Sequence, residues 1–183
     1  TMSLVDCNGL PVGPPLPGWT PRSLPPRTPL QGRFCRLEIL DVDRHATDLF
    51  AAYSLDPDDR HWTYLPYGPF ATLDDYRSWL IERTASGDPL YHIVIDLETG
   101  KAVGTAALMR MDPANGVIEV GNIRYSSLLQ RKPAATEAMY LLMRRVFGEL
   151  GYRRYEWKCD SLNAPSRRAA ARLGFTYEGI FRQ

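Results

Sequence analysis

Residues 90–126 contain three successive runs rich in β-branched, aromatic and other apolar residues, "LYHIVIDLETGKAVGTAALMRMDPANGVIEVGNIRYS". The runs are separated by "ETGK" and "DPANG", two short segments whose glycine, proline, asparagine and aspartate residues favour tight turns. Strand-forming runs joined by such short turns pair with their neighbours in an antiparallel direction. This stretch therefore predicts a three-stranded antiparallel meander.

A long amphipathic helix is predicted directly after the meander, over residues 134–151. Its apolar side chains recur at helical spacing and would form one face, and Gly151 suits the position just past a helix end. These apolar residues are Met139, Leu142, Met143, Val146, Phe147 and Leu150.

Shorter patterns on both sides of this core complete the predicted order of elements, β-α-α-β-β-β-α-β-α-β. They are a strand over 34–40, helices over 43–54 and 72–84, a strand over 152–160, a helix over 163–174 and a strand over 175–182. This order predicts an α+β fold with a mostly antiparallel sheet.

The N-terminal segment differs in composition, because eight of the fifteen prolines lie within residues 1–32. Such a segment favours polyproline II or irregular structure, so we interpret it as an arm that lies on the domain or on a neighbouring chain. A ligand of the PxxP type is the alternative. The predicted organisation is an arm over 1–32 and one domain over 33–183.

Charge and cysteine content exclude several kinds of partner. The formal net charge is +1, which gives no overall field for attracting nucleic acid or an anionic membrane. Cys7, Cys35 and Cys159 are odd in number and widely spaced, which argues against a disulfide framework and a zinc site. With no apolar run of membrane-spanning length and no signal peptide pattern, we expect a cytoplasmic protein that binds neither nucleic acid nor membrane.

The start of the helix at 134–151 carries an unusual polar run, "QRKPAAT" at 130–136. Proline is favoured in the first turn of any helix, so Pro133 has a purely structural explanation. Positive side chains beside free amides at a helix N-terminus also suit an anion. Both interpretations remain open from these residues alone.

Three motifs and the order of elements together resemble the GCN5-related N-acetyltransferase (GNAT) superfamily. The motifs are Q-x-x-P-x-A at 130–135, N-A-P-S at 163–166 and LGF-x-x-EG at 173–179. Within the superfamily the chain is most similar to the branch of ribosomal-protein N-terminal acetyltransferases. The resemblance covers residues 33–183 and implies helices on both faces of the sheet and a V-shaped splay between the fourth and fifth strands. It also implies that the family's final strand is missing from this sequence.

The resemblance further implies acetyl-CoA as the donor, with no metal, and assigns residues to it. Amides of the 130–136 loop would bind the pyrophosphate, although Pro133 stands where the family pattern has glycine and removes one donor. The backbone near Ile123 and Tyr125 would bind the pantetheine arm and the thioester oxygen. The assigned loop and helix residues are Gln130, Arg131, Lys132, Ala134, Ala135, Thr136, Asn163 and Arg168.

Two side chains are candidates for proton transfer. Glu119 matches a position where some family members keep a general base, and it could otherwise be a solvent-facing residue of an alternating strand. Ser166 could protonate the departing thiolate, or could be an ordinary residue of a first helical turn. Asn163 is either the helix cap, a contact to the pantetheine arm, or both.

The acceptor is expected to meet the aromatic segment "HWTYLPYGPF" at 61–70, through Trp62, Tyr64 and Tyr67. Such aromatic residues can also simply pack a loop. The three histidines have no metal-ligand spacing.

The sequence therefore predicts an N-acetyltransferase that transfers acetyl directly from acetyl-CoA to a primary amine in a ternary complex. The amine would belong to a protein N-terminus, an amino acid or another small molecule. A CoA-binding module without catalysis is the alternative, and a homodimer is one arrangement that would cover the open edge of the sheet.

Overall fold

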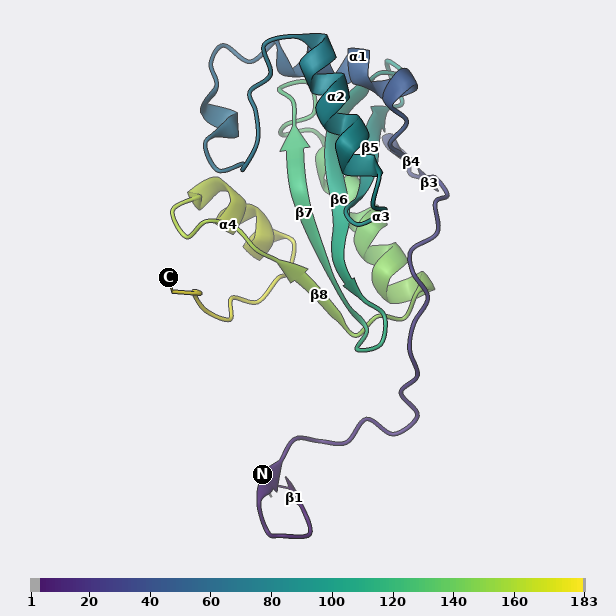
Figure 1. The fold of residues 1–183 in the computed structure, drawn as a ribbon, viewed down its shortest axis with the longest axis vertical. Helices are drawn as coiled ribbons and strands as arrows, with labels where there is room; N and C mark the ends of the chain where they lie inside the picture. The colour runs from purple at the N-terminus through teal and green to yellow at the C-terminus, as the bar shows by residue number, and fades with distance from the viewer. Residues whose placement is uncertain (1–3, 183) are drawn as a thin grey trace.

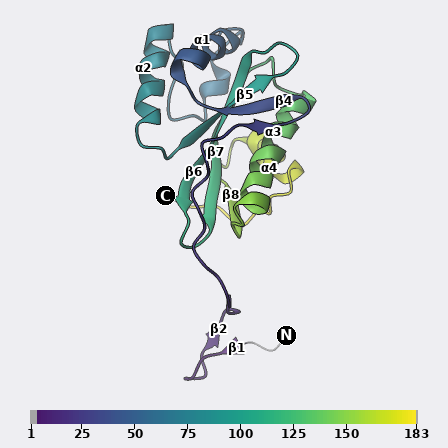
Figure 2. The same cartoon turned by 90° about the vertical axis from the view of Figure 1, so that its right-hand side faces the viewer.

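The computed structural model describes residues 4–182 and consists of a curled six-stranded sheet with helices on both faces (Figures 1 and 2). The sheet has the order β3-β4-β5-β6-β7-β8, and every neighbouring pair is antiparallel except β7 and β8, which are parallel. This is the predicted α+β fold with a mixed, mostly antiparallel sheet.

The bounds of the elements agree with most of the sequence expectations. The strands are β1 Leu4–Val5, β2 Pro11–Val12, β3 Leu30–Gln31, β4 Cys35–Ile39, β5 Leu90–Asp96, β6 Ala102–Asp112, β7 Val117–Tyr125 and β8 Arg154–Trp157. The helices are α1 Val42–Tyr53, α2 Leu73–Thr84, α3 Pro133–Arg144 and α4 Ala164–Arg172, with a 3-10 turn, η1, at Arg60–Trp62 and a π-helical turn, η2, at Arg145–Glu149. The predicted meander is β5-β6-β7.

Two apolar clusters hold the helices against the sheet. One lies between the sheet and α3 and includes Leu37, Ile118 and Leu142, and the other lies between the sheet and the α1/α2 pair and includes Leu49, Leu80 and Ile93. Both are expected from the alternation of apolar side chains along the strands, because each face of the sheet then presents its own apolar set.

The long helix differs from its prediction after Arg144, where the chain widens into the π-helical turn. Arg145 is 4% exposed there, and its guanidinium donates to the Thr28 carbonyl oxygen at 2.7 Å. A π-helical turn inserts one residue and thereby rotates the side chains of the next residues about the helix axis. Phe147, expected on the buried face, is accordingly 44% exposed.

The predicted strand over 175–182 is wrong, because Phe175–Arg182 form no strand in the structure. This segment is tied to β8 through side chains, with Glu178 accepting from Arg154 at 2.6 and 3.0 Å. Tyr177 and Phe181 are 69% and 87% exposed. Without a backbone ladder or an apolar surface to bury these side chains, the alternating pattern has nothing to stabilise it as a strand.

The part of the proline-rich N-terminal segment that carries β1 and β2 projects away from the six-stranded sheet, and the chain then leads along the domain to β3 (Figures 1 and 2). Trp19 donates from its indole to the Ala114 carbonyl oxygen at 2.8 Å, and Arg22 donates to the Gly151 carbonyl oxygen at 3.0 Å. The sheet begins at β3, which lies just before the boundary at 32/33 that the composition suggested.

Glu137 of α3 joins the helix to the start of β4. Its carboxylate accepts hydrogen bonds from three successive backbone N–H groups, those of Arg33, Phe34 and Cys35, at 2.7, 2.7 and 2.9 Å. The pKa of Glu137 lies below its ordinary value of 4.5, because these amide donors outweigh the opposing effect of burial.

We expect Glu137→Gln to lower the free energy of unfolding by about 2–4 kcal/mol. The side-chain NH₂ of glutamine would face backbone N–H groups, which are also donors, and the remaining hydrogen bonds would no longer be charge-assisted. The depressed pKa means that the contribution is present above pH 4.5 and is lost as the pH falls through the folded-state pKa. Urea denaturation should therefore show the gap between the two proteins closing toward pH 3. Glu82→Gln, on the exposed face of α2, is the matched control, and an equal loss in both variants would contradict the assignment.

Candidate active site

The predicted splay is present between β7 and β8. The two strands pair only over Val117–Val120 and Arg154–Trp157, whereas β7 continues to Tyr125. Figure 1 shows the strands together at the start of β7 and separating toward its end, with α4 following β8 outward. The second half of β7 therefore has β6 on one side and no paired strand on the other, and we call this unpaired side of β7 the gap.

A bulge lies in β7 where the gap opens. Thr105 of β6 faces Arg124 while Ala107 faces Gly121, so β7 holds one extra residue, and Asn122 adopts a left-handed φ of 48°. A Cβ on Gly121 would lie 2.6 Å from the Met109 sulfur, so any larger residue here would require the Met109 side chain to move.

The bulge determines which backbone groups face the gap. Ser126 donates its N–H to Val103 of β6 at 3.1 Å, so in an antiparallel ladder Arg124 also turns its peptide groups to β6. The peptide groups of Ile123 and Tyr125 then point away from β6, toward the gap. The side chains of these two residues pack into the cluster under α3.

The loop before α3 presents free amides at the end of this gap. Arg131 has a left-handed φ of 62°, Lys132 caps α3 without a side-chain hydrogen bond, and Pro133 is the first helical residue. Among residues 4–182, the N–H groups of Arg131 and Ala134 have no acceptor. Free amides beside a left-handed residue at a helix N-terminus form a concavity that suits an anion.

The other predicted loop residues have different surroundings. Gln130 donates from its side-chain amide to the Tyr125 carbonyl oxygen at 2.8 Å, which ties the loop to the end of β7. Arg131 and Lys132 are exposed, Ala134 is buried and Ala135 is partly buried. The Thr136 hydroxyl accepts from Arg172 of α4 at 3.1 Å.

The start of α4 holds Ser166 beside β8. The Asn163 side-chain oxygen caps the helix by accepting from the Ser166 N–H at 3.2 Å, and the Trp157 indole donates to the Ser166 hydroxyl oxygen at 3.0 Å. An indole N–H can only donate, so the Ser166 proton remains available for another acceptor. Arg168, on the same helix, is exposed.

Glu119 is buried and held by two cations. Its carboxylate accepts from Arg110 at 2.7 and 2.8 Å and from Lys158 of the segment after β8 at 2.8 Å. Hydrogen bonding to Glu119 raises the pKa of Arg110. For Lys158, burial acts to lower the pKa, but the hydrogen bonds to Glu119 and Glu156 outweigh it, and the pKa is raised.

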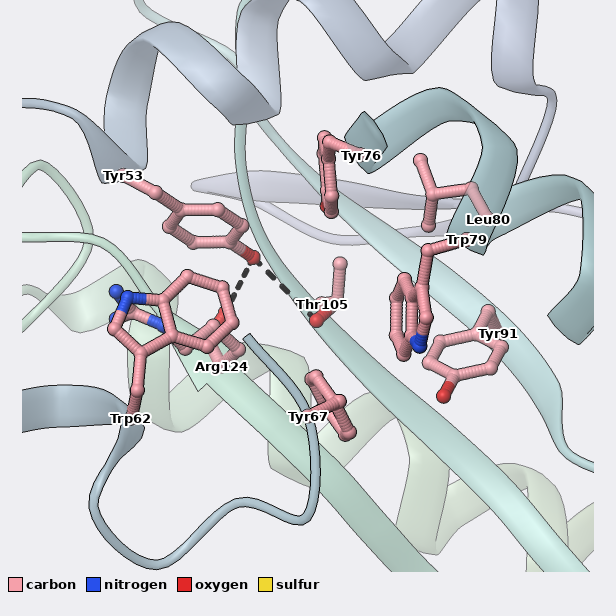
Figure 3. Close-up of a pocket in the computed structure, with 9 residues that line it drawn as sticks. All are labelled: Tyr53, Trp62, Tyr67, Tyr76, Trp79, Leu80, Tyr91, Thr105 and Arg124. Atoms are coloured by element: carbon pink, nitrogen blue, oxygen red, sulfur yellow. Dashed lines mark hydrogen bonds between the residues drawn. The ribbon is translucent and has the colours of Figure 1, made fainter. Parts of the chain in front are cut away.

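An aromatic pocket lies on the opposite face of the sheet from α3 (Figure 3). Trp62 and Tyr67, two of the residues expected to meet the acceptor, are among its lining residues, and the rings of Tyr67 and Trp79 lie 4.4 Å apart between centroids. Burial raises the pKa values of Tyr53 and Tyr67, so these phenols stay protonated at neutral pH and are not bases. Tyr64 lies outside this pocket and donates to the Leu162 carbonyl oxygen at 3.3 Å, which links the aromatic loop to the start of α4.

Sequence reasoning missed Arg124, which connects this pocket to β7. Its side chain is 4% exposed, pairs with Asp56 at 2.9 Å, and lies 4.4 Å from the Tyr53 ring and 4.5 Å from the Trp62 ring. The Tyr53 hydroxyl donates to the Arg124 carbonyl oxygen at 2.9 Å, as Figure 3 shows. The presence of an arginine between Ile123 and Tyr125, in a largely apolar strand, could have indicated a buried arginine with a carboxylate partner.

Comparison with known proteins agrees with this architecture. Residues 36–176 match the model of the acetyltransferase (GNAT) domain family. The chain is 52% identical to a GCN5-related N-acetyltransferase from Brucella melitensis, whose crystal structure has a TM-score of 0.89 over 92% of this chain and 76% of that one. A probable GNAT acetyltransferase from Chromobacterium violaceum is 41% identical, with a TM-score of 0.85 over 92% and 84% of the two chains. The uncharacterized N-acetyltransferase p20 of Bacillus licheniformis is 25% identical over 148 residues, which are 80% of this chain and 83% of that protein.

The chain belongs to the GNAT family of acetyltransferases. It is an N-acetyltransferase, and acetyl-CoA is the acetyl donor in this family. Within residues 4–182, no group of three or more histidine, cysteine, aspartate or glutamate side chains is placed to hold a metal ion. None of the helices in this range is long and apolar enough to cross a membrane.

Proposed function

We propose that the protein transfers acetyl from acetyl-CoA directly to a primary amine while both are bound. The observation that carries this proposal is the gap between β7 and β8, bordered by the peptide groups of Ile123 and Tyr125 and ending at the free amides before α3. The pantetheine arm would pair with β7 as an added strand, and its pyrophosphate would meet the loop.

In the proposed reaction, the amine nitrogen attacks the thioester carbonyl carbon. The carbonyl oxygen becomes negative and is stabilised by the N–H of Ile123, which the fold already directs toward the gap. When the tetrahedral intermediate collapses, the carbon–sulfur bond breaks, and the Ser166 hydroxyl supplies a proton to the CoA sulfur and regains one from solvent. The Trp157 indole, by donating to Ser166, keeps the hydroxyl proton directed outward.

The amine must lose a proton before it attacks, and Glu119 is the residue that the sequence suggested as base. Its carboxylate is buried and both of its oxygens are already engaged by Arg110 and Lys158, so neither oxygen is free to reach an amine. These contacts favour a different contribution, in which Glu119 fixes β7 to Lys158 just where the two strands separate. Water at the mouth of the gap would then receive the amine proton.

The aromatic pocket of Figure 3 has a volume of only about 10 Å³, so the acceptor would lie over its rim, on the face that carries Arg124. Trp62 and Tyr67 would form the wall that the acceptor meets, and Tyr64, outside the pocket, would limit the opening toward α4. The resemblance to ribosomal-protein N-terminal acetyltransferases makes a protein N-terminus the first acceptor to examine, ahead of an amino acid or another small amine.

Calorimetric titration with acetyl-CoA tests the donor site. We expect one-site binding that weakens roughly tenfold in Gln130→Ala, because the loop loses its tie to Tyr125, and holds or tightens in Pro133→Gly, because a helix-start N–H is restored. Glu82→Gln, far from the gap on α2, is the control. Unchanged affinity in Gln130→Ala together with weaker binding in Pro133→Gly would contradict the assignment of the loop.

A further inference from the structure

A second hollow adjoins the aromatic pocket and shares Tyr53, Trp62 and Tyr76 with it. Its volume is about 170 Å³. The remaining lining residues are Phe50, Ser54, Asp56, Asp58, Asp59, Pro69 and Phe70. The hollow therefore combines aromatic walls with three carboxylates, and none of its lining residues is positively charged.

The carboxylates are only partly neutralised by neighbouring cations. Asp56 uses one oxygen for Arg124, and Asp58 pairs with Arg60 at 2.7 Å. The other oxygen of Asp56 has no hydrogen-bond partner, and water cannot replace one, because the oxygen is buried and the Asp56 side chain is only 3% exposed. Asp59 is exposed, and within residues 4–182 its side chain does not cap η1 and takes part in no ion pair. A buried carboxylate oxygen without a hydrogen bond is costly, and a cationic donor in the hollow would satisfy it.

The aromatic walls favour the same kind of ligand. Aromatic rings attract cations through the negative charge of their faces, and guanidinium groups pack on them well. This chain already contains such an arrangement, because Arg124 lies between Tyr53 and Trp62 at the border of the hollow.

We propose that the hollow binds a second, positively charged group of the acceptor, of about the size of a guanidinium. This inference rests on the proposed function and extends it from a primary amine to an amine that carries a remote cation. Asp56 connects the hollow to Arg124, the residue next to Ile123, so a cation held here would belong to a molecule whose free amine reaches toward β7.

The test compares two ligands of nearly identical shape, 4-aminobutylguanidine and N-(4-aminobutyl)urea, which carry the same amine but differ in whether the other end is a charged guanidinium or an uncharged urea. Each is titrated calorimetrically into the full chain saturated with CoA. We expect 4-aminobutylguanidine to bind roughly tenfold more tightly than the urea ligand. This ratio of dissociation constants should fall severalfold in Asp59→Asn. Asp74→Asn, an equally exposed aspartate on α2 outside the hollow, should keep the preference of the unmodified protein.

Equal binding of the two ligands would overturn the inference, as would an unchanged preference in Asp59→Asn. Thiol release from acetyl-CoA, measured with the same two amines, distinguishes failure of the cation-site inference from failure of the proposed function. Equal and efficient acetylation of both would leave the proposed function intact and contradict the cation site. Failure to acetylate any amine would contradict the proposed function, while the binding comparison would still decide the inference.

Discussion

Arg124→Met should lower the free energy of unfolding by about 3–5 kcal/mol, the largest stability effect that we expect in this chain. Methionine preserves much of the buried stem, so the loss comes from the charge. Without the guanidinium, the Asp56 carboxylate would remain almost fully buried with no cation beside it. The Tyr53 and Trp62 rings would also lose the planar group that lies against both. Urea denaturation of both proteins gives the difference.

The double variant Arg124→Met with Asp56→Asn is the control for this result. Removing both charges eliminates the isolated buried carboxylate, so the double variant should be more stable than Arg124→Met alone. If the single and double variants unfold at the same urea concentration, the ion pair is not the source of the loss.

Ser166→Ala should lower kcat by about 100-fold or more, the range that positioned acid or base groups contribute. Acetyl-CoA affinity should change little, because Ser166 donates only when negative charge develops on the sulfur. Steady-state thiol release gives kcat, and calorimetry gives the affinity.

Trp157→Phe provides the comparison for Ser166. It keeps the hydroxyl and most of the ring while removing the indole N–H that orients it, so a smaller decrease in kcat is expected. A Ser166→Ala protein that retains kcat within a factor of two would exclude this hydroxyl as the proton donor.

The parts of the fold that depend on local patterns could be predicted from the sequence. The meander follows from two turns between β-rich runs, and α3 follows from the spacing of its apolar side chains.

Contacts between distant segments could not be predicted in this way. Arg124 and Asp56 are separated by 68 residues, and Glu137 and Phe34 by 103. No periodicity encodes such pairs, because the partner is chosen by packing after the elements form. The environment of Glu119 could not be predicted for the same reason. The alternation of β7 predicts on which face of the strand Glu119 lies, but it does not predict the ion pairs with Arg110 and Lys158. Arg110 has a left-handed φ of 45°, which no alternation pattern indicates.

The gap beside β7 is bordered mainly by backbone groups, whereas the proposed acceptor site is made of side chains. The two sites therefore differ in how strongly they depend on the amino-acid sequence. A peptide N–H is supplied by every residue except proline, so the part that would handle the thioester depends little on which side chains occupy residues 121–125. The pocket and the hollow depend instead on individual side chains, and the connection from α1 to α2 supplies Trp62 and Tyr67 to the pocket and most of the lining of the hollow. Substitutions in that connection can thus change which acceptor is bound while the backbone groups that serve acetyl transfer stay the same. Acceptor specificity can therefore evolve independently of the acetyl-transfer step.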